Sequence, residues 1–233
     1  MEPVPVKDKS EVSLPPAQDP NELFDVVTAD GEPTGCTKRR ADVHRDGDWH
    51  RALHIWVYGV GEDGSYVLMQ QRGLTKDTNP GMLDPAVSGH LGAGESVEDG
   101  FREMEEEIGI LPDPAKMRHV GTRPRAAEHT TPGVIDRELQ EVYLYRDERP
   151  LAAFRPNAAE LQGLLHIRLE DAIQLFAGEV TSVPARILDA RSLEIRHGEA
   201  NTTMFSSAMI DRYYLRAALA IERELRSVRY NIL

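Results

Sequence analysis

The chain has 233 residues, of which 40% are hydrophobic, and a formal net charge of −12. This length is typical of one large domain or one domain with extensions, and the composition is sufficient for a sizeable core. The acidic balance argues against non-specific nucleic-acid binding, which needs a basic surface. The single cysteine, Cys36, excludes an internal disulfide and a cysteine-based zinc cluster.

Two sequence features bear on location. No apolar run approaches the roughly 18 residues that a membrane span needs, and residues 1–10 lack the apolar centre of a signal peptide. We therefore expect a cytoplasmic protein with neither a membrane nor a nucleic acid as partner.

The chain begins with a segment rich in proline and charge, residues 1–21, which indicates a flexible arm. A folded pattern starts at Glu22, and Asp30-Gly31 predicts a hairpin turn. Strands are predicted from apolar and β-branched runs at 23–27, in the second half of 43–58, and at 66–72, 117–122, 137–145 and 160–169. Helices are predicted at 170–176 and 206–226, and a polar loop that rims the site at 124–136.

The most informative stretch runs from Gly89 to Ile110, with the sequence G-H-L-G-A-G-E-S-V-E-D-G-F-R-E-M-E-E-E-I-G-I. On a helix, Glu103, Glu106 and Glu107 share one face because they are spaced three and four residues apart. A second set repeats at helical spacing and predicts an apolar stripe facing the core: Val97, Phe101, Met104 and Ile108. Gly109 stands where a C-terminal glycine cap belongs.

Three carboxylates on one helix face repel one another, and Arg102 is the only cation close to them in the sequence. One interpretation is an acidic face in contact with solvent. The other is a site for Mg²⁺, which takes oxygen ligands and binds phosphate oxygens at the same time.

These residues resemble the Nudix box, G-x5-E-x7-R-E-U-x-E-E-x-G-U, in which U is aliphatic. Gly89 to Glu95 matches the first part, and Arg102 to Ile110 matches the second part residue by residue. One departure is present, because six residues rather than seven stand between Glu95 and Arg102. The departure affects the placement of Glu95 more than the register of the metal-binding glutamates.

A second set of motifs narrows the resemblance. The sequences H-R-x-G-x-W-H-R-A, Q-Q-R-x-x-x-K-D-x-x-P-G and S-G-H are similar to the isopentenyl-diphosphate isomerase branch of the Nudix superfamily, which contains both isomerases and hydrolases. Residues 23–176 carry this resemblance. His44, His50 and His90 stand at positions that match the metal-site histidines of the isomerases; the alternative is that they form ordinary hydrogen bonds at strand ends.

The resemblance leaves three functions open. The isomerases protonate with a cysteine just before the G-H pair, and this chain has Ser88 there, whose hydroxyl is far too weak an acid. The complete R-E-x-x-E-E set favours a hydrolase and speaks against a catalytically silent nucleotide sensor. We therefore expect a pyrophosphohydrolase that acts on a nucleoside diphosphate derivative or a related small-molecule diphosphate.

The resemblance also implies roles for individual residues. Glu103, Glu106 and Glu107 would hold Mg²⁺, or Mn²⁺ in its place, assisted by a backbone carbonyl near Gly89, while Arg102 would hold a box glutamate. A further glutamate from a later strand usually joins the metals; Glu141 matches best and Glu138 is in reserve, and the alternative is a surface carboxylate. The expected substrate contacts are Arg72, Lys76, His50 and His90, and no organic cofactor is expected.

The expected fold is an α/β/α Nudix sandwich with a mixed sheet, comprising a 1–21 arm, a 22–178 Nudix domain and a 179–233 C-terminal helical extension. The stripe of the 206–226 helix contains Ile210, Tyr214, Ala217, Ala218, Ile221 and Leu225. This helix would pack on the domain or form the interface of a homodimer. The substrate's identity, the catalytic base and the purpose of the extensions do not follow from the sequence.

Overall fold

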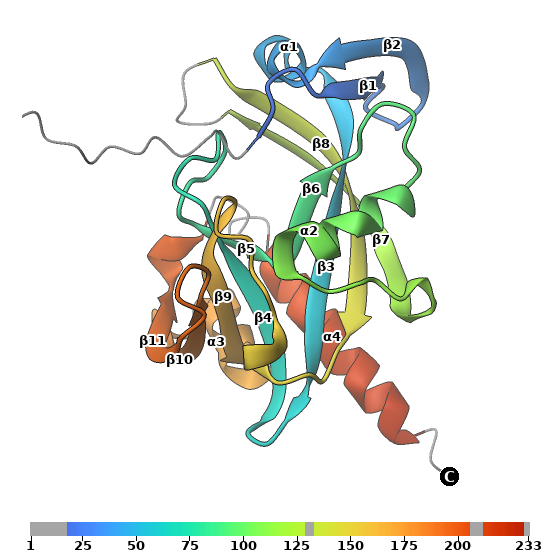
Figure 1. Cartoon of the computed structure of the whole chain (residues 1–233). Helices are drawn as coiled ribbons and strands as arrows, with labels where there is room; N and C mark the ends of the chain where they lie inside the picture. The colour runs from blue at the N-terminus through green and yellow to red at the C-terminus, as the bar shows by residue number, and fades with distance from the viewer. Residues whose placement is uncertain (1–17, 129–132, 206–211, 231–233) are drawn as a thin grey trace, which may run out of the picture.

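The structure is a computed structural model that describes residues 18–128, 133–205 and 212–230 (Figure 1). The strands are β1 (Leu23–Val27), β2 (Pro33–Arg39), β3 (Trp49–Gly61), β4 (Gly64–Arg72), β5 (Leu83–Pro85), β6 (Val87–His90), β7 (Met117–Glu128), β8 (Ile135–Arg146), β9 (Leu161–Arg168), β10 (Ser182–Asp189) and β11 (Ile195–Asn201). The α-helices are α1 (Arg40–Asp46), α2 (Glu103–Ile108), α3 (Leu169–Ala177) and α4 (Tyr213–Tyr230). The 3₁₀ turns are η1 (Asp99–Arg102), η2 (Pro114–Lys116), η3 (Leu151–Ala153) and η4 (Thr202–Met204).

The strands form one mixed sheet with the order β11-β10-β9-β4-β3-β1-β2. β3 and β8 pair in parallel, whereas the other pairs of described strands are antiparallel. β3 is almost continuously apolar from Ile55 to Tyr58, as expected for a strand covered on both faces.

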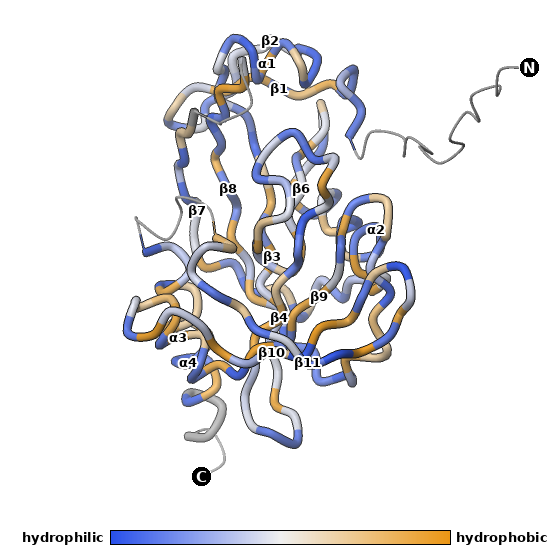
Figure 2. The backbone as a smooth tube through the Cα atoms, turned by 90° about the vertical axis from the view of Figure 1, so that its left-hand side faces the viewer, coloured by the Kyte–Doolittle hydropathy of each residue, from blue (hydrophilic) through white to orange (hydrophobic). Residues whose placement is uncertain are grey.

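Helices cover both faces of the sheet. On one face, η1 and α2 pack Phe101, Met104 and Ile108 against a cluster that includes Leu53 and Ile55 of β3. The other face is covered by α3 and α4, whose apolar residues pack in a cluster with Trp56 of β3. In Figures 1 and 2, α3 and α4 lie at the end of the molecule opposite to α1, β1 and β2, and hydrophobic stretches run along the interior strands. The expected α/β/α sandwich with a mixed sheet is therefore confirmed.

Two elements before the C-terminal extension differ from their predictions. The loop expected at 124–136 is largely strand, because β7 continues to Glu128 and β8 begins at Ile135; residues 129–132 lie outside the described part. The short helix α1 was not predicted, because its buried side chains include the polar Arg40 and His44 beside Val43, and they leave no apolar stripe to recognise.

The C-terminal extension contains more than a helix. β10 pairs with β9 and with β11, so residues 182–201 widen the same sheet. The predicted helix is described from Tyr213 onwards, and residues 206–211, including Ile210 of its stripe, lie outside the described part. None of the described helices is long and apolar enough to cross a membrane.

Candidate functional site

The strand register creates the pocket that contains most of the predicted site residues. β3 and β4 pair only at 58–61 with 64–67, and further along β6 pairs with β3 while β5 pairs with β4. The two halves of the sheet therefore separate and enclose a pocket of about 290 Å³. Its lining residues come from α1, α2, α4, the central strands and the loop between β4 and β5.

The most buried acid of the pocket is Glu107, which is fully buried on α2. Its Oε2 accepts hydrogen bonds from Gln70 Nε2 at 3.0 Å and from the backbone N–H of Ser88 at 2.9 Å. Its Oε1 has no hydrogen-bond partner among the described residues. Burial raises the pKa of Glu107 to about 8, although Lys76 opposes this rise.

Glu103 lies beside Glu107 and against the backbone of β6. A Cβ added at Gly89 would stand 2.6 Å from Glu103 Cδ, so only glycine leaves room for this carboxylate. Burial raises the pKa of Glu103 to about 7, with Arg102 acting in the opposite direction. The two acids are therefore desolvated, and a bound cation would favour their charged forms.

Arg102 holds the outer acids of this set in place. Its guanidinium lies 3.2 Å from Glu95 Oε1, 3.3 Å from Glu103 Oε1 and 3.4 Å from Glu106 Oε1. Glu106 is the most exposed of the three box glutamates and lines the pocket.

The short spacing between Glu95 and Arg102 is accommodated by the 3₁₀ turn η1, Asp99–Arg102, which leads directly into α2. A 3₁₀ turn rises more per residue than an α-helix, so fewer residues cover the same distance. Glu95 accepts a hydrogen bond from the Gly92 N–H at 2.7 Å and pairs with Arg102. Gly109 ends α2 in the left-handed conformation with φ 71°, as predicted.

A second group of potential metal ligands lies in or beside the same pocket. His44, His50, His90 and Asp136 each offer a ligand atom, and these atoms all lie within 4.8 Å of one another. They come from α1, β3, β6 and β8, which converge at this point. His90 Nε2 lies 2.9 Å from Glu138 Oε1, and this imidazole helps to hold the pKa of Glu138 well below its usual value although burial raises it.

The imidazoles differ in how well they fit a metal. Asp77 stands 3.5 Å from His44 Nδ1, and the Asp48 carbonyl stands 3.1 Å from His50 Nδ1, so in both rings Nε2 can face an ion. Neither Nε2 atom has a hydrogen-bond partner among the described residues. His90 differs, because Arg40 donates to its Nδ1 at 3.0 Å. In the neutral ring the proton then stands on Nε2, so coordination through Nε2 requires the contact with Arg40 to change.

Glu141 lies apart from the pocket that contains the box acids. Its carboxylate lies 2.9 Å from His119 Nε2 and accepts a hydrogen bond from Thr122 at 3.0 Å, outside the pocket lining. Side chains alternate along β8, so Glu138 and Gln140 face the opposite side of the sheet from Glu141. Glu138, the reserve candidate, lines the pocket instead.

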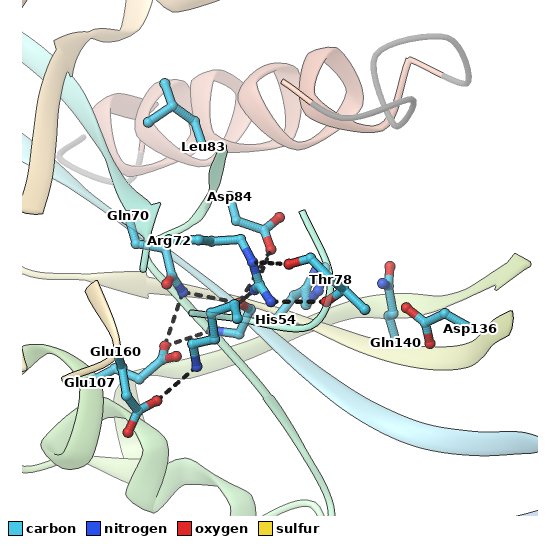
Figure 3. Close-up of polar contacts among 12 residues, drawn as sticks. His54, Gln70, Arg72, Thr78, Leu83, Asp84, Glu107, Asp136, Gln140 and Glu160 are labelled. Atoms are coloured by element: carbon cyan, nitrogen blue, oxygen red, sulfur yellow. Dashed lines mark hydrogen bonds and ion pairs between the residues drawn. The ribbon is translucent and has the colours of Figure 1, made fainter. Parts of the chain in front are cut away.

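Arg72 and Lys76 both line the pocket, but each already has internal partners. Arg72 donates to the Thr78 carbonyl and hydroxyl, and its Nη1 lies 3.2 Å from Asp84 Oδ2 (Figure 3). Lys76 Nζ lies 2.9 Å from Glu160 Oε2. Glu160 comes from the turn before β9, and in Figure 3 it lies close to Glu107.

Several pocket residues were not singled out from the sequence. Asp136 could have been found from its alternation with Glu138 and Gln140 on β8. Glu160 and Asp84 carry no local signal, since only the tertiary fold brings them to the box. Tyr213 lies 159 residues from its hydrogen-bond partner His54 in the sequence, and no local sequence pattern relates residues so far apart.

Comparisons with known proteins show the family of the chain. The family model described as the NUDIX domain matches residues 48–187, which is more than half of the chain. An uncharacterised Nudix hydrolase from Clostridium acetobutylicum is 32% identical over 146 residues, covering 63% of this chain and 70% of the relative. Nudix hydrolase 3 from Arabidopsis thaliana is 35% identical over 153 residues, covering 64% of this chain and 20% of that protein.

Weaker similarities extend to the isomerases and to solved structures. The isopentenyl-diphosphate isomerase of Streptomyces avermitilis is 26% identical over 140 residues, covering 60% of this chain and 67% of that enzyme. A crystal structure from Deinococcus radiodurans has 20% identity and a TM-score of 0.48, covering 67% of this chain and 90% of its own. The chain belongs to the Nudix family and, as a Nudix hydrolase, acts on phosphorus-containing acid anhydrides.

Proposed function

We propose that the protein is a Mg²⁺-dependent pyrophosphohydrolase that cleaves a diphosphate linkage in a nucleoside diphosphate joined to another group. The observation that carries this proposal is Glu107, a fully buried acid whose Oε1 has no partner among the described residues. It lies in one pocket with Glu103 and Glu106. Crowded and desolvated carboxylates are costly unless a cation joins them.

The residues present fit a hard divalent cation. Glu103, Glu106 and Glu107 would hold Mg²⁺ or Mn²⁺, assisted by a backbone carbonyl near Gly89, because such ions prefer oxygen ligands. A bound metal would supply positive charge that neutralises the phosphate oxygens and would lower the pKa of the attacking water. The side chains of His44, His50 and Asp136 would fit a second divalent ion. His90 would become a further ligand if the hydrogen bond from Arg40 to its Nδ1 were broken.

The chain's own side chains then have separate tasks. Arg102 holds Glu103 and Glu106 in their positions. Lys76, which is buried beside Glu160, would contact a phosphate as a point charge. We assign the further carboxylate expected from a later segment to Glu160 rather than Glu141, because Glu160 lines the pocket and its charge raises the pKa of both Glu103 and Glu107.

One observation favours a second candidate, an isopentenyl-diphosphate isomerase. His44, His50 and His90, which match isomerase motif positions in the sequence, have ligand atoms within 4.8 Å of one another. Against it, the protonating position is Ser88, whose Oγ lies within hydrogen-bond distance of Gln70 and Arg72 and is no thiol. The complete R-E-x-x-E-E set speaks against the third function considered, a non-catalytic nucleotide sensor. The cytoplasmic location and the homodimer expected from the sequence also stay predictions.

The substitution Glu106→Gln tests the proposal. We expect turnover to fall by orders of magnitude while the fold is retained, because the exposed Glu106 contributes a metal ligand and little packing. The measurement is phosphate-coupled turnover with Mg²⁺ on nucleoside triphosphates, nucleotide sugars, dinucleotides, thiamine diphosphate and isopentenyl diphosphate.

The matched control is Glu105→Gln, which removes an exposed charge from the same helix outside the pocket lining and should leave turnover unchanged. Near-normal activity of the Glu106→Gln protein would overturn the assignment. Tight binding of a nucleotide without turnover would favour the sensor.

A further inference from the structure

We propose that the deep end of the pocket is a polar subsite in which His54, held by Tyr213 of the C-terminal helix, donates a hydrogen bond to a hydroxyl-bearing, sugar-like group attached to the diphosphate. The proposal rests on the proposed function, since it assumes that a diphosphate occupies the carboxylate side of the same pocket. It makes His54 a specificity residue and gives α4 a part in substrate recognition.

The first observation is the position of His54. It follows His50 by four residues on β3, so both side chains leave the same face of the strand. The pocket therefore extends along this face from the cluster of His44, His50, His90 and Asp136 to His54. His54 is 6% exposed and lines the pocket. Its cross-strand partner on β6 is Ser88, the residue next to Gly89.

The second observation is a hydrogen-bonded chain behind His54. Trp56 Nε1 donates to the Tyr213 hydroxyl at 2.9 Å, and the same hydroxyl lies 2.9 Å from His54 Nδ1. The indole can only donate, so the tyrosyl oxygen accepts from it, and we infer that the hydroxyl donates a hydrogen bond to Nδ1. His54 then carries its ring proton on Nε2. Burial also lowers the pKa of His54, which keeps the ring neutral.

The third observation is that His54 Nε2 makes no hydrogen bond to any residue that the structure describes, although the side chain is more than nine-tenths buried. A donor in the lining of a pocket can pair with an oxygen of a bound ligand. A ligand oxygen at the deep end of the pocket would supply this acceptor.

The surroundings indicate what kind of ligand fits. Asp84 and Glu138 add carboxylate acceptors to the lining, Arg123 adds a guanidinium 4.2 Å from the centre of the Tyr213 ring, and Tyr214 adds a phenol. Among the residues described, no aliphatic side chain lines this pocket. Hydroxyl groups both donate and accept, so a polyhydroxylated group can pair with this mixture. A hydrocarbon tail would desolvate the same groups without pairing them.

The experiment compares two non-hydrolysable probes by isothermal titration calorimetry in the presence of Mg²⁺. One is the α,β-methylene analogue of ADP-ribose, which carries hydroxylated groups beyond its two phosphorus atoms. The other is methylenediphosphonate, which lacks them. Because neither probe is cleaved, binding is measured independently of turnover.

We expect His54→Ala to weaken binding of the ADP-ribose analogue about tenfold, the equivalent of one hydrogen bond. Binding of methylenediphosphonate should stay unchanged. His54→Gln, whose amide can donate from nearly the same place, should restore affinity for the analogue. Tyr213→Phe should weaken it in the same direction, because it removes the hydroxyl that fixes the ring.

Tyr66→Phe is the matched control, since it removes a buried hydroxyl that donates to the Asp147 carbonyl outside the pocket. Equal losses for both probes in His54→Ala, or no loss for either, would overturn the subsite. Tighter binding of isopentenyl methylenediphosphonate than of the ADP-ribose analogue would overturn it too. Selective binding without turnover of any substrate would instead leave the subsite standing and contradict the proposed hydrolysis.

Discussion

At the scale of single residues, the site is defined by acids that the protein buries without full compensation. One carboxylate oxygen of Glu107 accepts two hydrogen bonds, whereas the other accepts none from the described residues. Glu103 fits only because residue 89 is a glycine. In the metal-free protein these acids therefore keep their protons up to unusually high pH. The free energy of unfolding then depends on pH.

We expect the free energy of unfolding of the metal-stripped protein to fall between pH 6.5 and 8.5. The unfolded acids ionise near 4.5, whereas folded Glu103 and Glu107 have pKa values of about 7 and about 8. Over this range the folded state binds more protons, so stability decreases as pH rises, by about 2 kcal/mol. The buried histidines have lowered pKa values, about 3 for His90, so the unfolded rings, which are half protonated at pH 6.5, add a smaller rise in stability that offsets part of this fall at the start of the range.

Urea unfolding at the two pH values measures this difference. Glu107→Gln should flatten the dependence, whereas the exposed Glu105→Gln should retain it. A stability that does not change with pH in the wild-type protein, or the same fall in Glu107→Gln, would contradict the assigned pKa values.

The residue scale also shows where sequence reasoning succeeds and where it fails. The helical spacing of Glu103, Glu106 and Glu107 placed them together correctly, because a helix fixes its own neighbours. The choice of Glu141 over Glu138 relied on the family pattern, although the period of two along β8 separates their faces. Glu160 and Tyr213 reach the pocket only through long-range packing, which no local pattern encodes.

At the scale of elements, the C-terminal helix is part of the main core. Tyr214, Ala217, Ala218 and Ile221 are buried in the cluster that contains Trp56, as the predicted apolar stripe requires. This element was predictable because the 3.6-residue period is strong over its length. The surface against which the helix packs was not predictable, because the period shows which side of the helix is apolar but not which residues cover that side.

The contribution of α4 can be measured with Ile221→Ala. Ile221 is fully buried, so its truncation leaves a cavity and should destabilise the protein by about 2–5 kcal/mol. Leu219→Ala, on the exposed side of the same helix, should change stability by less than about 0.5 kcal/mol. If thermal and urea unfolding show equal, small effects for both variants, α4 would not be packed as described.

At the scale of the whole molecule, the two halves of the sheet separate around one pocket and give it two different ligand sets. The Nudix-box acids of α2 form one set, and the imidazoles with Asp136 form the other. The first set is expected of a hydrolase and the second resembles the isomerase branch. The central claim is that the box acids direct the chemistry, so that water attacks phosphorus.

Isotope transfer from water tests this claim most directly. The best substrate of the turnover panel is cleaved with Mg²⁺ in oxygen-18-labelled water, and the phosphate-containing products are analysed by mass spectrometry, with Glu106→Gln as the blank. The account predicts that one product phosphate gains a single labelled oxygen and that the blank gives none. Conversion of isopentenyl diphosphate to dimethylallyl diphosphate with no label in any phosphate, and no cleavage of any other substrate, would contradict it.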